Sequence, residues 1–171
     1  MNSRERVQAA LAGEVPDRAP VCLHNSHLAA AQAGISMSQY RKDPMAIAQA
    51  HLQLAAEGIF TVVHTCGDTA KILESLAEYD CCGFEFDHKT DPMAAQHKVG
   101  ARHVLFGNVD PSAVLALGTP ALVRQKTREL ISVWKPQGRF VLNSGCALPS
   151  STPPENIRAF IETAHEFGVY T

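Results

Sequence analysis

Five pairs in which an aspartate or threonine precedes a proline divide the chain, and they limit its fold more than any other feature. Each pair combines a side chain that can cap a helix with a proline that suits the first helical position, so each predicts a helix start. The pairs are Asp43-Pro44, Asp91-Pro92, Asp110-Pro111, Thr119-Pro120 and Thr152-Pro153. The chain is therefore expected to enter a helix repeatedly along its length.

The helix after Thr152 is the best defined of these. The segment Thr152-Pro153-Pro154-Glu155 has the spacing of a capping box, and apolar residues then recur at helical spacing until Gly168. This pattern predicts a helix over residues 153–167. Asp68 is likewise expected to cap a helix, whose apolar face is Ile72, Leu73 and Leu76. The helix that begins at Thr119-Pro120 is marked by apolar residues at Val123, Leu130, Ile131 and Trp134.

Short runs of residues that favour β-strands lie between the predicted helices. They are residues 20–24, 59–64, 83–87, 103–106 and 139–143. Strands that alternate with helices indicate βαβ crossovers and a parallel sheet. The sequence therefore predicts an α/β fold.

Composition and charge disfavour several classes of protein. The 171 residues are 46% hydrophobic, which suits one globular domain with its own core. Lysine and arginine are scattered and the formal net charge is -2, so we expect no nucleic-acid partner and no membrane binding. The absence of a signal-peptide pattern and of a long apolar run favours a cytoplasmic location. In a reducing cytoplasm, the five cysteines are expected to be thiols or metal ligands rather than disulfide partners.

Histidine and cysteine residues follow two of the predicted strands. His64-Thr65-Cys66-Gly67-Asp68 stands where the second strand ends, and Asn143-Ser144-Gly145-Cys146 follows the last one. Residues two apart in an extended chain point the same way, so His64 and Cys66 can bind one metal ion. The carboxyl ends of parallel strands carry the active site in such folds, so Cys146 can complete the set. Two cysteines, one histidine and an open position are typical of catalytic zinc, and ordinary packing of these side chains is the alternative.

Other polar residues lie on the same edge of the predicted sheet. Asp87 is a candidate catalytic residue that orients a metal ligand or contacts substrate, unless it is an ordinary strand-end carboxylate. Glu85 shares its strand face and is expected either to turn inward or to meet solvent. Asn108 and Asp110 follow another strand and are candidates for cofactor binding, although helix capping comes first for Asp110.

Several of these segments resemble one known superfamily. His64-Thr65-Cys66-Gly67-Asp68 resembles the His-x-Cys-Gly motif of methylcobalamin:coenzyme M methyltransferases, which belong to the uroporphyrinogen decarboxylase-like superfamily. In those enzymes the zinc ligands are that histidine, that cysteine and a cysteine far downstream, and Cys146 stands in the matching position. Gly107-Asn108-Val109-Asp110-Pro111 is similar to a Gly-Asn-Leu-Asp-Pro stretch of the superfamily, and residues 2–7 and 13–21 are similar to its N-terminus.

The resemblance implies an activity, its cofactors and a fold. A protein of this kind would bind Zn²⁺ through His64, Cys66 and Cys146 and transfer a methyl group from methylcobalamin, or another corrinoid, to a thiol such as coenzyme M. A small thiol would be the substrate, and a corrinoid protein is a candidate partner. The implied fold is a TIM-barrel-derived domain over residues 1–171, with an N-terminal block over 1–58 and the C-terminal half of the family barrel over 59–171.

Two departures from the family pattern bear on function. The decarboxylases carry an Arg-Gln-Ala-Gly-Arg motif that binds substrate carboxylates, whereas this chain has His24-Asn25-Ser26-His27-Leu28-Ala29-Ala30 there. The missing arginines disfavour porphyrinogen decarboxylation, and His24 and His27 are either replacement ligands or ordinary histidines. Five predicted strands form only part of a (β/α)₈ barrel, which takes about 250 residues. We therefore expect an incomplete barrel that forms a homo-oligomer such as a dimer or has a rearranged sheet, or else a poorly active remnant. Decarboxylase-type activity and a non-catalytic tetrapyrrole- or corrinoid-binding subunit are the alternatives.

Overall fold

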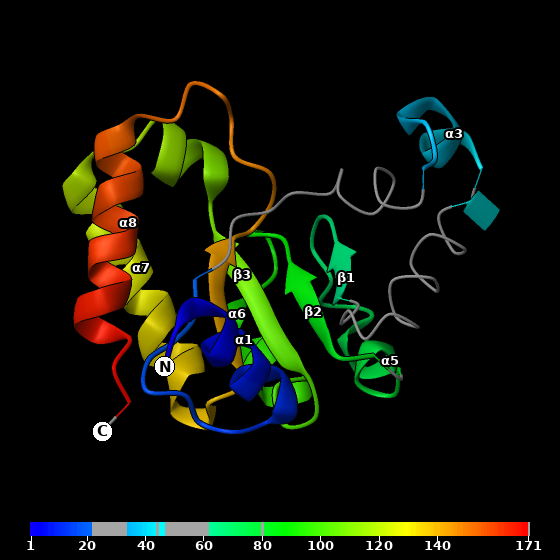
Figure 1. Ribbon diagram of the computed structural model, residues 1–171, viewed down its shortest axis with the longest axis horizontal. Coiled ribbons are helices and arrows are strands. Elements are labelled where there is room, and N and C mark those ends of the chain that lie inside the picture. The colour runs from blue at the N-terminus through cyan, green and yellow to red at the C-terminus, as the bar shows by residue number, and fades with distance from the viewer. Residues whose placement is uncertain (22–33, 44, 47–61, 80, 171) are drawn as a thin grey trace. The chain divides into compact units, whose positions relative to one another are not determined.

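In the described part of the chain, four parallel strands lie side by side and organise the fold (Figure 1). In chain order, which is also their order in the sheet, they are β1 (Val62–Thr65), β2 (Gly83–Phe86), β3 (Val104–Val109) and β4 (Phe140–Ser144). Of the strand predicted over residues 20–24, Val21 forms a parallel bridge to Leu142, and the remainder after Val21 lies outside the described residues. The predicted α/β fold with a parallel sheet is confirmed.

The computed structural model describes residues 1–21, 34–43, 45–46, 62–79 and 81–170. The chain divides into two compact units, one of Met1–His24 with Val63–Thr171 and one of Asn25–Val62. In the second unit, α3 (Met37–Lys42) begins after Ser36, whose hydroxyl accepts a hydrogen bond from the Gln39 amide. The expectation of one domain across residues 1–171 stays a prediction.

Helices connect the strands, as parallel pairing requires. The larger unit contains α1 (Ser3–Ala12), α5 (Leu73–Ala77), α6 (Pro92–Lys98), a π-helical turn η1 (Pro111–Ala116), α7 (Pro120–Trp134), a short 3-10 helix η2 (Lys135–Gln137) and α8 (Pro154–Phe167). Figure 1 shows α7 and α8 together on one side, while α1 lies near the amino-terminal end of β4. Each strand is followed by a connecting segment before the next helix, so these segments surround the carboxyl ends of the strands.

Three of the predicted helix starts have the expected caps. Asp91 accepts a hydrogen bond from the Ala94 amide, Asp110 accepts from the Ser112 and Ala113 amides, and Thr119 accepts from the Leu122 amide. Asp43 instead ends α3, and Pro44 lies outside the described residues.

The capping box predicted at Thr152 is wrong, although its helix is present. Pro153 occupies the N-cap position and has no side chain that can accept, while the Thr152 hydroxyl donates to the Pro149 carbonyl at 2.7 Å. The hydroxyl therefore stabilises the preceding loop rather than the helix. The predicted end at Gly168 is confirmed.

The helix predicted after Asp68 begins later than expected. Asp68 accepts from the Ala70 amide and so closes a turn, and α5 starts only at Leu73. Leu73 is buried and Leu76 is partly buried, but Ile72 is exposed. A local side-chain hydrogen bond thus competes with helix formation at Asp68, as short polar side chains often do.

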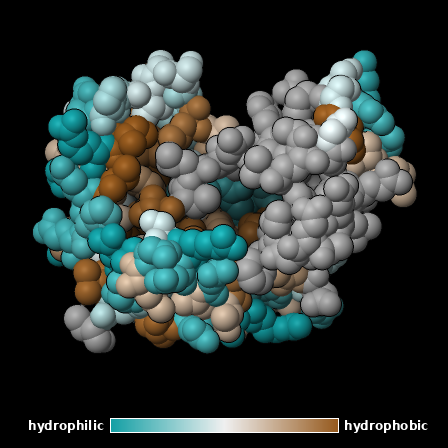
Figure 2. Space-filling model, viewed as in Figure 1, coloured by the Kyte–Doolittle hydropathy of each residue, from teal (hydrophilic) through white to brown (hydrophobic). Residues whose placement is uncertain are grey.

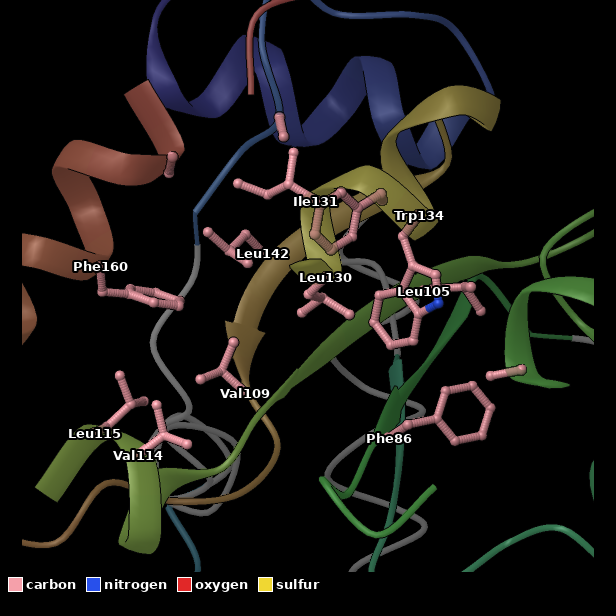
Figure 3. Close-up of a cluster of buried hydrophobic side chains, with 14 of the residues drawn as sticks. Phe86, Leu105, Val109, Val114, Leu115, Leu130, Ile131, Trp134, Leu142 and Phe160 are labelled. Carbon is pink, nitrogen blue, oxygen red and sulfur yellow. The ribbon is translucent and has the colours of Figure 1, made fainter. Parts of the chain in front are cut away.

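One face of the sheet packs against the helices and is apolar. Figure 3 shows side chains from β2, β3 and β4 meeting those of α7 and α8; the labelled members include Phe86, Leu105, Val109, Leu142, Leu130, Ile131, Trp134 and Phe160. Within this core, the Trp134 Nε1 donates to the Pro92 carbonyl at 2.8 Å, and its ring meets the Phe140 ring edge-on. Trp134 therefore joins α6, α7 and β4.

Side chains at alternate positions point to the other face of the sheet and are more polar. Glu85, Asp87, Asn108 and Asn143 occupy these positions and are all buried. Asn108 and Asn143 lie beside each other in the register of β3 and β4. Because side chains alternate along a strand, the same short strands supply both the apolar core and a polar surface.

Hydropathy is also segregated on the outside of the molecule. Figure 2 shows a hydrophilic outer edge at α8, where Glu155, Glu162 and Glu166 are exposed, and hydrophobic side chains on the inner side of that helix. Among the helices of the described residues, none is long and apolar enough to cross a membrane.

We expect Trp134→Ala to lower the free energy of unfolding by about 3–5 kcal/mol, because it leaves a cavity in the core and removes the bond to Pro92. Urea denaturation of the purified chain measures this change. Leu117→Ala is the control, since Leu117 is 83% exposed, and it should change stability by less than about 0.5 kcal/mol. Equal effects of the two substitutions would contradict the packing described for α7.

Candidate metal centre

His64, Cys66 and Cys146 come together at the carboxyl-terminal edge of the sheet. One ligand atom from each lies within 4.8 Å of the other two. In tetrahedral zinc, with Zn–S bonds of about 2.3 Å and Zn–N bonds of about 2.0 Å, neighbouring ligand atoms are about 3.5–3.8 Å apart. Small side-chain movements are therefore sufficient for the three residues to hold one ion.

The end of β1 presents the first two of these residues. His64 and Cys66 alternate with Thr65, and the His64 Nε2 lies 3.1 Å from the Cys66 Sγ. The Thr65 hydroxyl instead contacts the Glu85 carbonyl of β2. Gly67 then turns the chain away with a φ of 82°, a conformation that glycine adopts without strain. This is the geometry predicted for a His-x-Cys-Gly segment after a strand.

The end of β4 presents the third residue. The Ser144 hydroxyl donates to the Cys146 carbonyl at 2.7 Å, and the Gly145 amide donates to the Val109 carbonyl at 2.8 Å. A Cβ atom on Gly145 would collide with the backbone of His88, so only glycine allows this loop to pack against the end of β2. The loop is thus held against two neighbouring strands and carries Cys146 toward β1.

Glu85 turns inward and contacts the candidate ligand His64. Its Oε2 lies 3.0 Å from the His64 Nδ1, and its Oε1 accepts a hydrogen bond from the Asn143 Nδ2. With the proton on Nδ1, the Nε2 lone pair of His64 is available on the side of Cys66. A carboxylate that holds the second nitrogen of a histidine is a common partner of metal-binding histidines. The inward alternative predicted for Glu85 is therefore correct.

Asp87 fixes the loop that follows Cys66. Its Oδ2 accepts from the Gly67 amide at 2.9 Å, and its Oδ1 accepts from the Lys89 amide at 3.0 Å. Burial acts to raise the pKa of Asp87, but these backbone hydrogen bonds and the neighbouring His88 outweigh burial, so the pKa is lowered overall. Asp87 is thus a structural anchor for the Cys66 loop, and its predicted catalytic role stays a prediction.

Negative charge gathers around the thiols. The pKa of the Cys66 thiol is raised, first because removal from water disfavours the thiolate and then because Cys146, Asp87 and Glu85 lie close. A bound divalent cation has the opposite effect, since it stabilises thiolates and offsets the carboxylates. The two thiols and the imidazole are therefore suited to bind a soft or borderline metal ion such as zinc, more than to remain without one.

Asn108 and Asp110 have structural contacts, and their predicted cofactor-binding role stays a prediction. The Asn108 amide donates to the Asp87 and Thr90 carbonyls, which holds the turn after β2. Asp110 caps η1. Both also line a pocket of about 490 Å³ between that turn and α7. A larger groove between α7 and α8, of about 620 Å³, contains none of the candidate site residues.

His88 is a site residue for which the sequence analysis predicts no role. Its Nδ1 lies 2.9 Å from the Asp87 Oδ1, and its Nε2 lies 3.5 Å from the Asp110 Oδ2. It therefore links the ends of β2 and β3 and lines the 490 Å³ pocket. Its position directly after a strand-end aspartate was the available signal.

The other histidines and cysteines do not join the group in the described part of the chain. His97 and His165 are exposed on α6 and α8, and Cys81 and Cys82 lie at the amino end of β2. Cys22, His24, His27 and His51 lie outside the described residues. For His24 and His27, the two alternatives of replacement ligand and ordinary histidine therefore both stay predictions.

We expect Asp87→Asn to destabilise the metal-free chain at pH 7, and the difference from wild type to shrink as the pH falls below about 4. The pKa of Asp87 in the folded chain is lower than its ordinary value of 3.8. The ionised carboxylate therefore stabilises the fold above that value, and this stabilisation is lost as the pH falls through the folded-state pKa. Urea denaturation at several pH values measures the difference. Glu78→Gln, which changes an exposed carboxylate, is the control. A loss of unfolding free energy in Asp87→Asn that is the same at every pH would contradict the account.

A protein-family model matches the chain over residues 54–167, and its description is uroporphyrinogen decarboxylase (URO-D). Three curated proteins are similar. A uroporphyrinogen decarboxylase from Psychromonas ingrahamii is 33% identical over 57% of this chain and 27% of its own length. A methylcobamide:CoM methyltransferase from Methanosarcina acetivorans is 31% identical over 63% of this chain and 30% of its own length. A methylated-thiol–coenzyme M methyltransferase from Methanosarcina mazei is 31% identical over 77% of this chain and 34% of its own length.

A solved structure has a similar fold. A methyltransferase from Methanosarcina mazei aligns with a TM-score of 0.59 and 21% identity, over 96% of this chain and 47% of that one. The chain spans about a third or less of the length of the three curated relatives. The similarity therefore covers most of this chain but only part of each relative.

Proposed function

The chain belongs to the uroporphyrinogen decarboxylase family, and on that premise we propose that it binds zinc and transfers a methyl group from a methylcorrinoid to a thiol such as coenzyme M. The convergence of His64, Cys66 and Cys146 is the observation that carries this proposal. Two thiolates and one imidazole leave a fourth position for substrate, as in catalytic rather than structural zinc sites. The similarity to coenzyme M methyltransferases supports it.

The residues of the site have distinct roles in this proposal. His64, Cys66 and Cys146 would hold the ion, Glu85 orients His64, and Asp87 fixes the loop after Cys66. Zinc, when bound, would supply a positive charge that favours the deprotonated form of a thiol. A methylcorrinoid, when bound, would supply the methyl group to the thiolate sulfur and would retain the electron pair of its cobalt–carbon bond.

The surroundings of the site extend the proposal. Asp87, Asn108 and Asp110 lie on the same edge of the sheet as the ligands, and we assign them to contacts with substrate or corrinoid. The four parallel strands would belong to a TIM-barrel-derived sheet that is not a complete (β/α)₈ barrel. A corrinoid protein that delivers the methyl group and a second copy of this chain are the partners that fit.

Decarboxylation of a porphyrinogen is the second candidate function. It is favoured by the similarity to a uroporphyrinogen decarboxylase. It is disfavoured by the absence of arginine from residues 24–30, because substrate carboxylates need cationic partners. Decarboxylation also leaves the convergence of two thiols with the imidazole unexplained. Methyl transfer therefore accounts for more of the site.

The double variant Cys66→Ala/Cys146→Ala should lose the metal that wild type retains. We expect about one zinc per chain in wild type, purified without chelators, and less than about a tenth of that in the variant, because one imidazole alone binds zinc weakly. Elemental analysis of the purified proteins measures the content. Cys82→Ala is the matched control, since Cys82 lies outside the group, and it should bind as wild type does. Equal zinc in all three proteins would refute the metal site.

Zinc-loaded wild type should demethylate methylcobalamin in the presence of coenzyme M, and Cys146→Ala should be at least about 100-fold slower. The decrease in the absorbance of methylcobalamin reports the rate, and mass spectrometry identifies the methylated thiol. Cys82→Ala should retain the wild-type rate. Loss of carbon dioxide from uroporphyrinogen, without methyl transfer to any thiol, would favour the second candidate instead.

A further inference from the structure

Both polar atoms of the Asn143 side-chain amide form hydrogen bonds, and the residue is 2% exposed. Its Nδ2 donates to the Oε1 of Glu85, and its Oδ1 accepts from the Ser144 amide at 2.9 Å. Asn143 lies on β4, and Glu85 lies on β2, two strands away. The buried Asn143 side chain thus reaches across β3 and connects β4 to β2 next to the candidate ligands.

The first contact controls the orientation of His64. Glu85 is 7% exposed, so its carboxylate depends on protein partners rather than water. One oxygen accepts from Asn143 and the other lies 3.0 Å from the His64 Nδ1. With one oxygen held by Asn143, the other is fixed in the direction of the imidazole. The Nε2 of His64 is then fixed in the direction of Cys66.

The second contact controls the path of the chain to Cys146. Ser144 is fully buried, and its amide and hydroxyl are both used: the amide donates to Asn143, and the hydroxyl donates to the Cys146 carbonyl at 2.7 Å. The two bonds fix the backbone on either side of Gly145. The direction in which Cys146 leaves the strand therefore depends on Asn143.

We propose that Asn143 is the positioning residue of the metal centre, which sets the His64 imidazole through Glu85 and the Cys146 loop through Ser144. The inference rests on the proposed function, because it assumes that these residues bind a metal ion. An amide is suited to the role, since it offers a donor to a carboxylate and an acceptor to a backbone amide from one rigid group. An aspartate would keep the acceptor, lose the donor and place a second negative charge beside Glu85.

An exchange of donor and acceptor tests the contact between the two residues. Glu85→Gln and Asn143→Asp each remove one half of the pair. In Glu85→Gln/Asn143→Asp, the glutamine amide can donate to the aspartate, and its carbonyl oxygen still faces the His64 Nδ1. We expect each single variant to weaken zinc binding about 10- to 100-fold, and the double variant to bind more tightly than either single variant.

Two readouts separate positioning from a general effect on stability. Competition with a chromophoric chelator gives the zinc affinity of the full chain, and the absorption spectrum of the Co²⁺-substituted protein reports the arrangement of the ligands. Both should change in the single variants and return toward wild type in the double variant. Thermal unfolding of the metal-free proteins is measured in parallel. Glu166→Gln, which makes the same change in an exposed side chain of α8, should leave every readout unchanged.

The outcomes distinguish this inference from the proposed function. Wild type that binds no zinc would refute both. If wild type binds zinc and the fold-decrease in zinc affinity of the double variant equals the product of the two single decreases, the role of Asn143 is refuted but the proposed function is not. A fall in melting temperature with an unchanged Co²⁺ spectrum would likewise assign Asn143 to stability. If Asn143→Asp does not fold, Asn143→Ala removes both contacts without adding charge, and wild-type affinity in that variant would overturn the inference.

Discussion

The parallel direction of the strands is the constraint on which the site depends. Parallel strands present all their carboxyl ends at one edge of the sheet, so the residues that follow β1 and β4 can meet although about 80 positions separate them in the sequence. Alternation along each strand then divides the side chains. Phe86 and Leu142 enter the helix-covered core, whereas Glu85 and Asn143 reach the other face. The same short strands therefore carry both the apolar core and the polar site.

Electrostatics gives the site its chemical character. Glu85 and Asp87 bring two carboxylates near two thiols. The pKa of Cys66 is raised, first by burial and then by Cys146 and these carboxylates. Backbone amides and the Asn143 amide offset part of the negative charge, since they point at the carboxylate oxygens. Isolated thiols gain nothing from such surroundings, whereas a divalent cation does. The arrangement is thus consistent with a site whose charge is balanced by a metal ion.

Much of the fold was predictable, because its signals are local. Asp91, Asp110 and Thr119 cap helices as their spacing to proline indicates, and the run of strands and helices indicates a parallel sheet. Thr152 and Asp68 were misjudged, because each side chain takes a nearby backbone partner instead of a helix cap. The group of His64, Cys66 and Cys146 followed from strand-end placement and family resemblance. Glu85 and Asn143 were harder, since the partners that join them to the site lie on other strands and no local pattern identifies them. His88 was missed although it directly follows a strand-end aspartate.

X-ray absorption spectroscopy at the zinc edge of the zinc-loaded chain tests the central claim most directly. The account predicts two sulfur neighbours at about 2.3 Å, together with nitrogen or oxygen neighbours at about 2.0–2.1 Å that include one imidazole. A first shell of nitrogen and oxygen alone, or of four sulfurs, would contradict a centre built from His64, Cys66 and Cys146.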